Sequence, residues 1–246
     1  GGGIAGIQDA AMRDYANTTF NAEFYLDASA EVKSARETAT GVEIHYRHRD
    51  GAWHTEAFDH VLAATGRAPH VARLALENTG LPLDARGVPV FDRFTMQCGT
   101  SAIFMAGDAS NDVPLLHEAA DQGRIAGENA ARYPDVRSGL RRAPLAVVFT
   151  DPQVASVGLT LKQLDAHFKG RFAVGQVSFE DQGRSRVMLR NQGLLKVYAE
   201  HGSGLFLGAE MFGPAAEHIG HLLAWAAQQR LTVSRMLEMP FYHPVI

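Results

Sequence analysis

The sequence predicts a chain that joins an α/β part to a separate α+β part. Up to about residue 142, helical and strand-like segments alternate with glycine-containing loops. From Ala143 onward, five strand-like segments precede two helices, and strands followed by helices are typical of an α+β domain. The chain has 246 residues, a length that suits one or two domains.

The first 66 residues are expected to form one helix and three strands. Residues 8–24 carry apolar side chains at helical spacing, and Asp50-Gly51 is a strong hairpin-turn signal. The predicted strands are 42–46, 53–58 and 60–64. The last of these is a short apolar run, which indicates a buried strand end.

Residues 67–142 are expected to hold a loop-rich segment, a strand, a helix and a linker. Glycine and proline interrupt residues 67–99. Residues 101–110, SAIFMAGDAS, are predicted to be a buried strand ending at a glycine, and the Ala- and Glu-rich residues 115–131 a helix. Residues 133–142, with a proline, a glycine and several arginines, are interpreted as a linker.

The last part of the chain is predicted to hold five strands and two helices. The strand-like segments lie within 144–160, 171–179, 185–190, 193–200 and 205–213, and the helices within 214–239. The first helix carries an apolar face with Ile219, Leu222, Leu223, Trp225 and Ala226.

Composition excludes several classes of function. The 46% hydrophobic and 20% charged residues are ordinary for a globular protein. A net charge of −4 favours neither nucleic acid nor an anionic membrane surface, and no apolar run approaches the roughly 20 residues of a membrane-spanning helix. The first residues do not resemble a signal peptide, so we expect a cytoplasmic protein.

We expect no metal site and no redox cysteine pair in this chain. Its single cysteine, Cys98, cannot form an intrachain disulfide or a multi-thiolate site. The eleven histidines show no His-x-x-x-His spacing with a nearby acid, the pattern of a helical zinc site. We interpret His54, His60 and His70 as surface or hydrogen-bonded residues.

Three motifs carry candidate chemistry, and each has a simpler structural alternative. In Ala64-Thr65-Gly66-Arg67-Ala68-Pro69 a glycine follows a strand, which suits either a nucleotide approaching the backbone or a plain strand exit. Asp108 ends the next strand and precedes the 115–131 helix, so it either accepts hydrogen bonds from a ligand hydroxyl or caps the helix region. His243 lies in Phe241-Tyr242-His243-Pro244, where a lone histidine is usually structural.

The order and spacing of these motifs resemble the pyridine nucleotide-disulfide oxidoreductases. ATGRAP is followed about forty residues later by IFMAGD, then by a helix, APLAVVFTDPQVASVGLT and FYHP. The resemblance extends from about residue 9 to residue 246 and is nearest to the dihydrolipoamide dehydrogenase-like branch.

The resemblance implies FAD and NAD(P) as cofactors, a homodimer and a dithiol or disulfide substrate. It implies that Gly66 contacts the dinucleotide and that Asp108 binds the ribityl chain of the flavin. The backbone of Leu115, Leu116 and His117 would bind FAD, and His243 would be the catalytic histidine given to the active site of the partner subunit. The implied domains are 1–66, the tail of a nucleotide-binding domain; 67–142, a central FAD-contacting segment; and 143–246, an α+β dimerisation domain.

The sequence also departs from the family pattern. The family's Cys-x4-Cys pair and glycine fingerprints are absent, although Gly1 to Gly6 imitate part of one. The glutamate expected five residues after the histidine lies beyond Ile246. We therefore expect a fragment that is inactive alone and binds FAD weakly or not at all. Mercuric ion, glutathione or a quinone as electron acceptor remains open, as does a non-catalytic dimerisation module.

Overall fold

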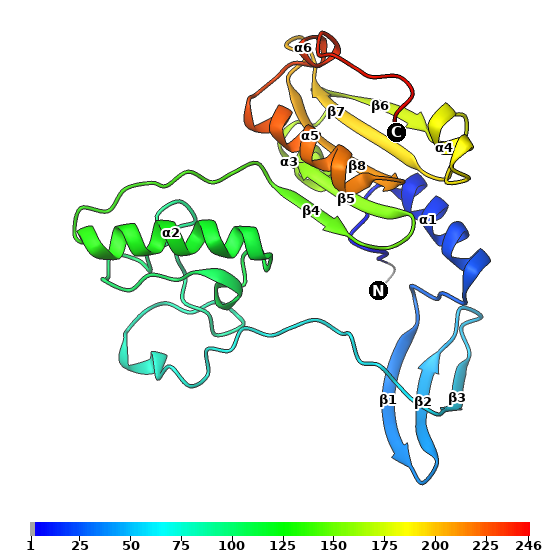
Figure 1. Ribbon diagram of the computed structural model, residues 1–246. Helices are drawn as coiled ribbons and strands as arrows, with labels where there is room; N and C mark the ends of the chain where they lie inside the picture. The colour runs from blue at the N-terminus through cyan, green and yellow to red at the C-terminus, as the bar shows by residue number, and fades with distance from the viewer. Residues whose placement is uncertain (1–2) are drawn as a thin grey trace. The chain divides into compact units, whose positions relative to one another are not determined.

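The computed structural model describes residues 3–246, so Gly1 and Gly2 of the N-terminal glycine run lie outside the described residues. The chain separates into two compact units. One unit combines the residues up to Leu62 with Ala143–Ile246, and the other is Ala63–Arg142. Figure 1 shows the helices and strands of both units.

The first unit opens with a helix and an antiparallel sheet. Helix α1 (Ala10–Glu23) confirms the predicted helix and buries Met12, Ala16 and Phe20. The sheet has the order β1 (Glu31–Thr38), β2 (Gly41–Arg47), β3 (Trp53–Phe58). Strands β2 and β3 were predicted. Strand β1 was not, because its side chains are mostly polar and exposed and so give no alternating pattern.

The turn between β2 and β3 forms as the Asp-Gly pair predicts. The Gly51 N–H donates to the carbonyl oxygen of His48 at 2.8 Å, and the His48 N–H donates to that of Ala52 at 3.0 Å. Gly51 has φ +82°, the left-handed conformation that glycine adopts most readily. A turn followed by a left-handed residue closes a three-residue hairpin loop.

The predicted buried strand at residues 60–64 is wrong. These residues form no strand and are exposed. A strand is stable only when a neighbouring strand accepts and donates its backbone hydrogen bonds. No segment among residues 3–246 pairs with this run, which joins the two units.

The rest of the first unit is a five-stranded antiparallel sheet with helices. Its order is β4 (Leu145–Val148), β5 (Gln153–Gly158), β8 (Phe206–Gly213), β7 (Leu194–Glu200), β6 (Phe172–Ser178). Its helices include α3 (Leu161–His167), α5 (Ala216–Gln228) and α6 (Val233–Leu237), the last two as predicted.

The predicted strand at 185–190 is also wrong, because its first three residues belong to helix α4 (Gly183–Val187). The side chain of Gln182 accepts a hydrogen bond from the Ser185 N–H at 2.6 Å and caps the helix. A cap of this kind stabilises the first turn, and apolar residues in a short segment cannot distinguish helix from strand.

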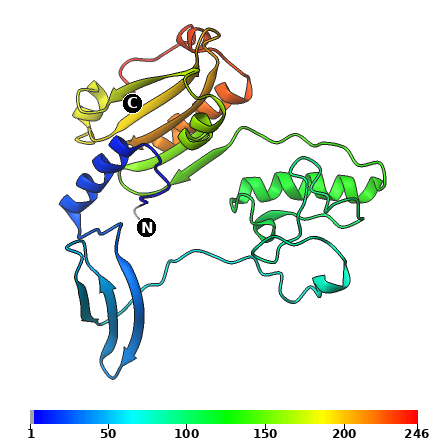
Figure 2. The same cartoon turned by 180° about the vertical axis from the view of Figure 1, so that it is seen from behind.

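Helices cover both faces of this sheet, so β8 is buried along its whole length. On one face α5 packs against β5 and β8, as Figures 1 and 2 show from opposite sides. On the other face Met12, Ala16 and Phe20 of α1 share a core cluster with Phe212 of β8. The rings of Phe20 and Phe212 meet edge to face with centroids 5.5 Å apart. The N-terminal helix is thus part of the core of the C-terminal domain.

A buried polar network fixes the start of α1 on the sheet. Glu210 is 3% exposed and accepts the backbone N–H groups of Gln8 at 2.7 Å and Asp9 at 3.0 Å. The ammonium of Lys196 lies 2.6 Å from the Asp9 carboxylate, which also caps α1. Burial and the neighbouring Glu210 raise the pKa of the Tyr198 hydroxyl, which therefore stays a proton donor to Glu210.

The second unit contains the short helices η1 (Leu76–Asn78) and η2 (Gly107–Ser110) and the long helix α2 (Leu116–Arg132), the last as predicted. The buried strand expected at 101–110 is wrong. Only single bridges form there, including Gln97 with Phe104, and Ile103 is exposed. Backbone pairing with 96–98 is too short to continue as a ladder.

The predicted linker 133–142 has no helix or strand, but it packs on the second unit. Asn129 of α2 is 2% exposed, and its amide exchanges hydrogen bonds with the backbone of Arg137 at 2.8 and 2.9 Å. The Gly139 N–H donates to Phe94 at 2.8 Å. These bonds hold the segment against the helix.

Candidate functional site

The Asp108 loop is held against α2 by a buried glutamine. Gln122 is fully buried, and its Oε1 accepts the Gly107 N–H at 2.8 Å and the Ser110 hydroxyl at 3.2 Å. The Asp108 carboxylate itself is about half exposed. The buried amide therefore fixes the backbone of the loop while the carboxylate remains available to a ligand.

Asp108 meets the first sequence motif through Arg67. The Arg67 guanidinium lies 2.9 Å from Oδ2 of Asp108. Gly66, next to Arg67, has φ +99°, and a Cβ built there would have no atom within 4 Å. The backbone at Gly66 is therefore open to the close approach of another molecule. The structure thus brings the Gly66 and Asp108 motifs together in one unit.

The beginning of α2 offers free backbone donors. Leu115 is its N-cap, and no side chain in the described part of the chain caps it. The N–H groups of the first turn, at Leu116, His117 and Glu118, have no intrahelical acceptor. The Leu116 side chain is 88% exposed, and His117 is exposed too. An uncapped helix start of this kind favours an anionic group such as a phosphate.

A largely buried network of ion pairs contacts the first turn of α2, and it was not predicted from the sequence. Arg141 lies 2.6 Å from Glu118 in the first turn of α2 and 3.3 Å from Asp112. Arg93 also pairs with Asp112 at 2.9 Å. The sequence of residues 133–142, with its several arginines, was interpreted as a linker. The signal that could have identified the network is an acidic residue in the first turn of a helix, which needs a cation when it is buried.

His243 lies in the first unit, on an exposed segment anchored at its end. Gln182 donates a hydrogen bond to the carbonyl oxygen of Val245, and Ile246 packs against the cluster around Met211. His243 itself is exposed, and within residues 3–246 its ring has no hydrogen-bond partner. Phe241 and Tyr242 are also exposed. The imidazole is therefore free to meet a group from outside this unit.

The apolar face predicted on α5 is divided between core and surface. Ala226 is buried, and Ile219 and Leu223 are partly buried, since they pack on the sheet. Leu222 and Trp225 are 62% and 66% exposed. Further exposed apolar side chains follow along the chain to its end: Leu237, Met239, Phe241 and Tyr242. Large apolar side chains exposed on one helix and along the segment that follows it favour an interaction surface.

Cys98 has no role in this site. It is fully buried in a cluster with Val71, Val88 and Met105. Burial raises the pKa of its thiol, which disfavours the reactive thiolate.

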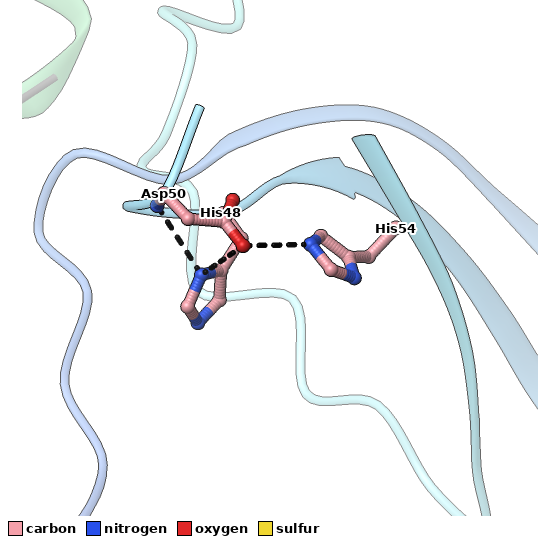
Figure 3. A group of neighbouring side chains, drawn as sticks. All are labelled: His48, Asp50 and His54. Atoms are coloured by element: carbon pink, nitrogen blue, oxygen red, sulfur yellow. Dashed lines mark hydrogen bonds and ion pairs between the residues drawn. The ribbon is translucent and has the colours of Figure 1, made fainter. Parts of the chain in front are cut away.

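A second group of polar side chains lies in the β2–β3 hairpin. His48, Asp50 and His54 each offer one nitrogen or carboxylate oxygen, and no two of these atoms are more than 4.8 Å apart (Figure 3). The sequence search for a helical His-x-x-x-His pattern did not find this group, because a hairpin brings together residues at other spacings. No helix within residues 3–246 is long and apolar enough to cross a membrane.

Two family models match the chain. The dimerisation domain of the pyridine nucleotide-disulphide oxidoreductases matches residues 145–246, and the pyridine nucleotide-disulphide oxidoreductase model matches residues 3–123. Members of this family use FAD and NAD(P).

Individual proteins agree with these matches. The dihydrolipoyl dehydrogenase of Haloferax volcanii is 34% identical over 86% of this chain and 44% of its own length. The mercuric reductase of Shigella flexneri is 33% identical over 74% of this chain and 32% of its own length. The crystal structure of LpdA from Mycobacterium tuberculosis superimposes with a TM-score of 0.81 and 26% identity, covering 97% of this chain and 51% of that one. The chain thus spans about half or less of the length of these relatives.

Proposed function

Because this chain belongs to the pyridine nucleotide-disulphide oxidoreductase family, we propose that it is the C-terminal part of a flavin-dependent NAD(P)H:disulfide oxidoreductase. The dihydrolipoyl dehydrogenase type is favoured, with a lipoyl-type dithiol as substrate. The observation that carries the proposal is the half-exposed Asp108 carboxylate beside the uncapped start of α2.

The residues present fit a flavin dinucleotide. A carboxylate accepts hydrogen bonds from sugar-like hydroxyls, so Asp108 would hold the ribityl chain. The first-turn N–H groups of Leu116 and His117, after the Leu115 cap, would bind the anionic or carbonyl groups of the cofactor. The open backbone at Gly66 would admit the nicotinamide dinucleotide. When bound, FAD supplies the two-electron chemistry between the nicotinamide and a disulfide.

His243 would act as a general acid–base on a thiol of the partner subunit. Its imidazole is exposed and unpaired within the described residues, and a neutral or protonated imidazole exchanges protons near pH 7. Mercuric ion is the second candidate acceptor, because a mercuric reductase is among the similar proteins. A cytoplasmic location belongs to the same proposal, since NAD(P)H is an intracellular electron donor.

The flavin assignment is tested by removing the Asp108 carboxylate. In a catalytically complete enzyme that contains this chain, we expect Asp108→Ala to weaken FAD binding by about 10- to 100-fold, the usual loss for a hydrogen bond to a charged group. The measurement is the flavin content after gel filtration, together with an FAD titration of the apoenzyme. Asp135→Ala is the matched control, because Asp135 is an exposed carboxylate of the same unit. Equal flavin binding by both variants would remove Asp108 from the site.

We also propose that residues 143–246 form a homodimer through the exposed surface of α5 and the C-terminal segment. Replacing a large aromatic side chain at an interface centre typically costs at least about 2 kcal/mol of binding. We expect Trp225→Ala to raise the dimer dissociation constant roughly 30-fold or more, as measured by sedimentation equilibrium. Trp53→Ala, on the β2–β3 hairpin, is the control. A chain that stays monomeric at all concentrations would contradict the proposal. It would also argue against a non-catalytic dimerisation module, since that alternative needs a dimer too.

A further inference from the structure

The loop of the β2–β3 hairpin brings together two imidazoles and one carboxylate. Nε2 of His54 lies 3.2 Å from Oδ2 of Asp50, and Nδ1 of His48 lies 3.4 Å from the same oxygen (Figure 3). Zinc–nitrogen and zinc–oxygen bonds are about 2.0–2.2 Å, so neighbouring ligands of a tetrahedral ion are about 3.4 Å apart. Two of the three separations between ligand atoms, 3.2 and 3.4 Å, are within 0.2 Å of this value.

The hydrogen bonds of the loop leave two atoms with lone pairs facing each other, Nδ1 of His48 and Oδ2 of Asp50. The backbone N–H of Asp50 points to Nδ1 of His48 at 3.3 Å, and a backbone N–H can only donate. Nδ1 is then the acceptor and carries no proton to give to Oδ2 of Asp50. An ion placed between these atoms satisfies both of them, and metal binding requires this unprotonated form of the imidazole.

Neighbouring residues hold two of the three ligands in position. The hydroxyl of Tyr25 lies 2.5 Å from Nε2 of His48, and the two rings stack with centroids 5.7 Å apart. The other oxygen of Asp50, Oδ1, accepts the Ala52 N–H at 2.8 Å. Hydrogen bonds of this kind orient metal ligands and select the nitrogen or oxygen that is used. Here they leave Nδ1 of His48 facing Oδ2 of Asp50, and the same oxygen faces Nε2 of His54.

We propose that His48 Nδ1, Asp50 Oδ2 and His54 Nε2 bind one divalent transition-metal ion of the zinc and copper class at the tip of the β2–β3 hairpin. Imidazole nitrogens favour zinc and copper over magnesium and calcium, which take oxygen ligands. Three protein ligands leave at least one position for water. Because Asp50 and His54 are exposed, the ion exchanges with solvent and is removed by a chelator.

The first test is zinc titration of the tag-free full chain after treatment with EDTA and dialysis. Isothermal titration calorimetry should show one Zn²⁺ per chain. His54→Gln and Asp50→Asn should each weaken this binding by at least about tenfold, the lower limit seen for loss of a supporting contact to a metal site. Asn at position 50 keeps an oxygen for the Ala52 N–H, so the loop is retained. Circular dichroism checks that each variant folds.

His45→Gln is the matched control. His45 lies on β2 of the same hairpin, but its ring stacks on Trp53 and bonds Thr55, outside the group. This variant should bind zinc as the unchanged chain does. Undiminished binding by His54→Gln and Asp50→Asn, or an equal loss in His45→Gln, would overturn the proposal and indicate scattered surface histidines.

A second measurement has a deciding outcome on the unchanged chain, which does not depend on the folding of any variant. Electron paramagnetic resonance of the unchanged chain with one equivalent of Cu²⁺ should show hyperfine coupling to two imidazole nitrogens. The same spectrum of His54→Gln should show one. A spectrum of the unchanged chain without imidazole coupling would overturn the site, because both of its nitrogen ligands would then be unused.

Discussion

In a catalytically complete enzyme that contains this chain, His243→Gln should lower steady-state turnover of a dithiol or disulfide substrate by about 10²- to 10⁴-fold, the usual contribution of general acid–base catalysis. Thiol–disulfide exchange proceeds through a thiolate, and a nearby base controls how much of it is present. Gln keeps much of the size and some of the hydrogen bonding of His but cannot take up a proton. The exposed imidazole of His243, on its anchored segment, is available for this role.

Reduction of the flavin by NADH should remain nearly unchanged in the same variant. Hydride transfer depends on stacking and orientation of the nicotinamide and needs no proton from His243. Stopped-flow flavin reduction beside steady-state turnover separates the two half-reactions. His218→Gln, an exposed histidine of α5 in the same domain, is the control. If both half-reactions slow equally, His243 has a structural role. If neither slows, it takes no part in catalysis.

Much of the fold could be predicted where one face of an element is buried. Residues 10–23, α2 and α5 show the apolar periodicity that burial imposes. Strands β2 and β3 could be predicted from the Asp50-Gly51 turn between them, although every residue of β3 is exposed. Strand β1 lacks apolar periodicity, because all but its last residue is exposed. The segments 60–64 and 185–190 contain apolar residues and were predicted to be strands, but neither forms one. A strand needs a partner that the first segment does not have, and Gln182 caps a helix in the second.

The residues of the candidate site could be predicted from the sequence, but the buried side chains that hold them in place could not. Glycine before Arg67 and aspartate after Gly107 are visible in the sequence as motifs. The buried Gln122 that holds the Asp108 loop and the Arg141 pair with Glu118 are not, since each joins residues 15 or more positions apart. The His48, Asp50 and His54 group escaped because its spacing belongs to a hairpin loop rather than a helix.

The packing of α1 on the C-terminal sheet was likewise not predicted, because it depends on contacts between residues nearly 200 positions apart. Asp9 joins Lys196 and Glu210 in a largely buried network. Burial of Asp9 opposes its ionisation, but the hydrogen bonds from Lys196 and from the N–H of Met12 outweigh this, so the pKa of Asp9 lies below its ordinary value of 3.8. The network therefore ties two distant segments together with a charged pair.

Lys196→Met should lower the free energy of unfolding of the first unit by about 3–5 kcal/mol, the cost of removing one partner of a buried ion pair. Met fills much of the same space but leaves the carboxylate of Asp9 without its cation. Urea denaturation followed by circular dichroism measures the change. Glu43→Gln breaks the exposed pair with Arg36 and should cost less than about 1 kcal/mol.

A double-mutant cycle and the pH dependence distinguish the pair from general packing. Asp9→Asn keeps the helix cap. In the double variant with Lys196→Met, the loss of unfolding free energy should fall short of the sum of the two single losses by more than about 1 kcal/mol.

A carboxyl whose pKa is lowered in the folded state stabilises the fold above its unfolded pKa and loses this contribution as the pH falls through the folded pKa. The stabilisation by Asp9 should therefore be complete at neutral pH and fade below about pH 4. Additive losses, or an acid-unfolding curve that Asp9→Asn leaves unchanged, would show that α1 is held by its apolar face alone.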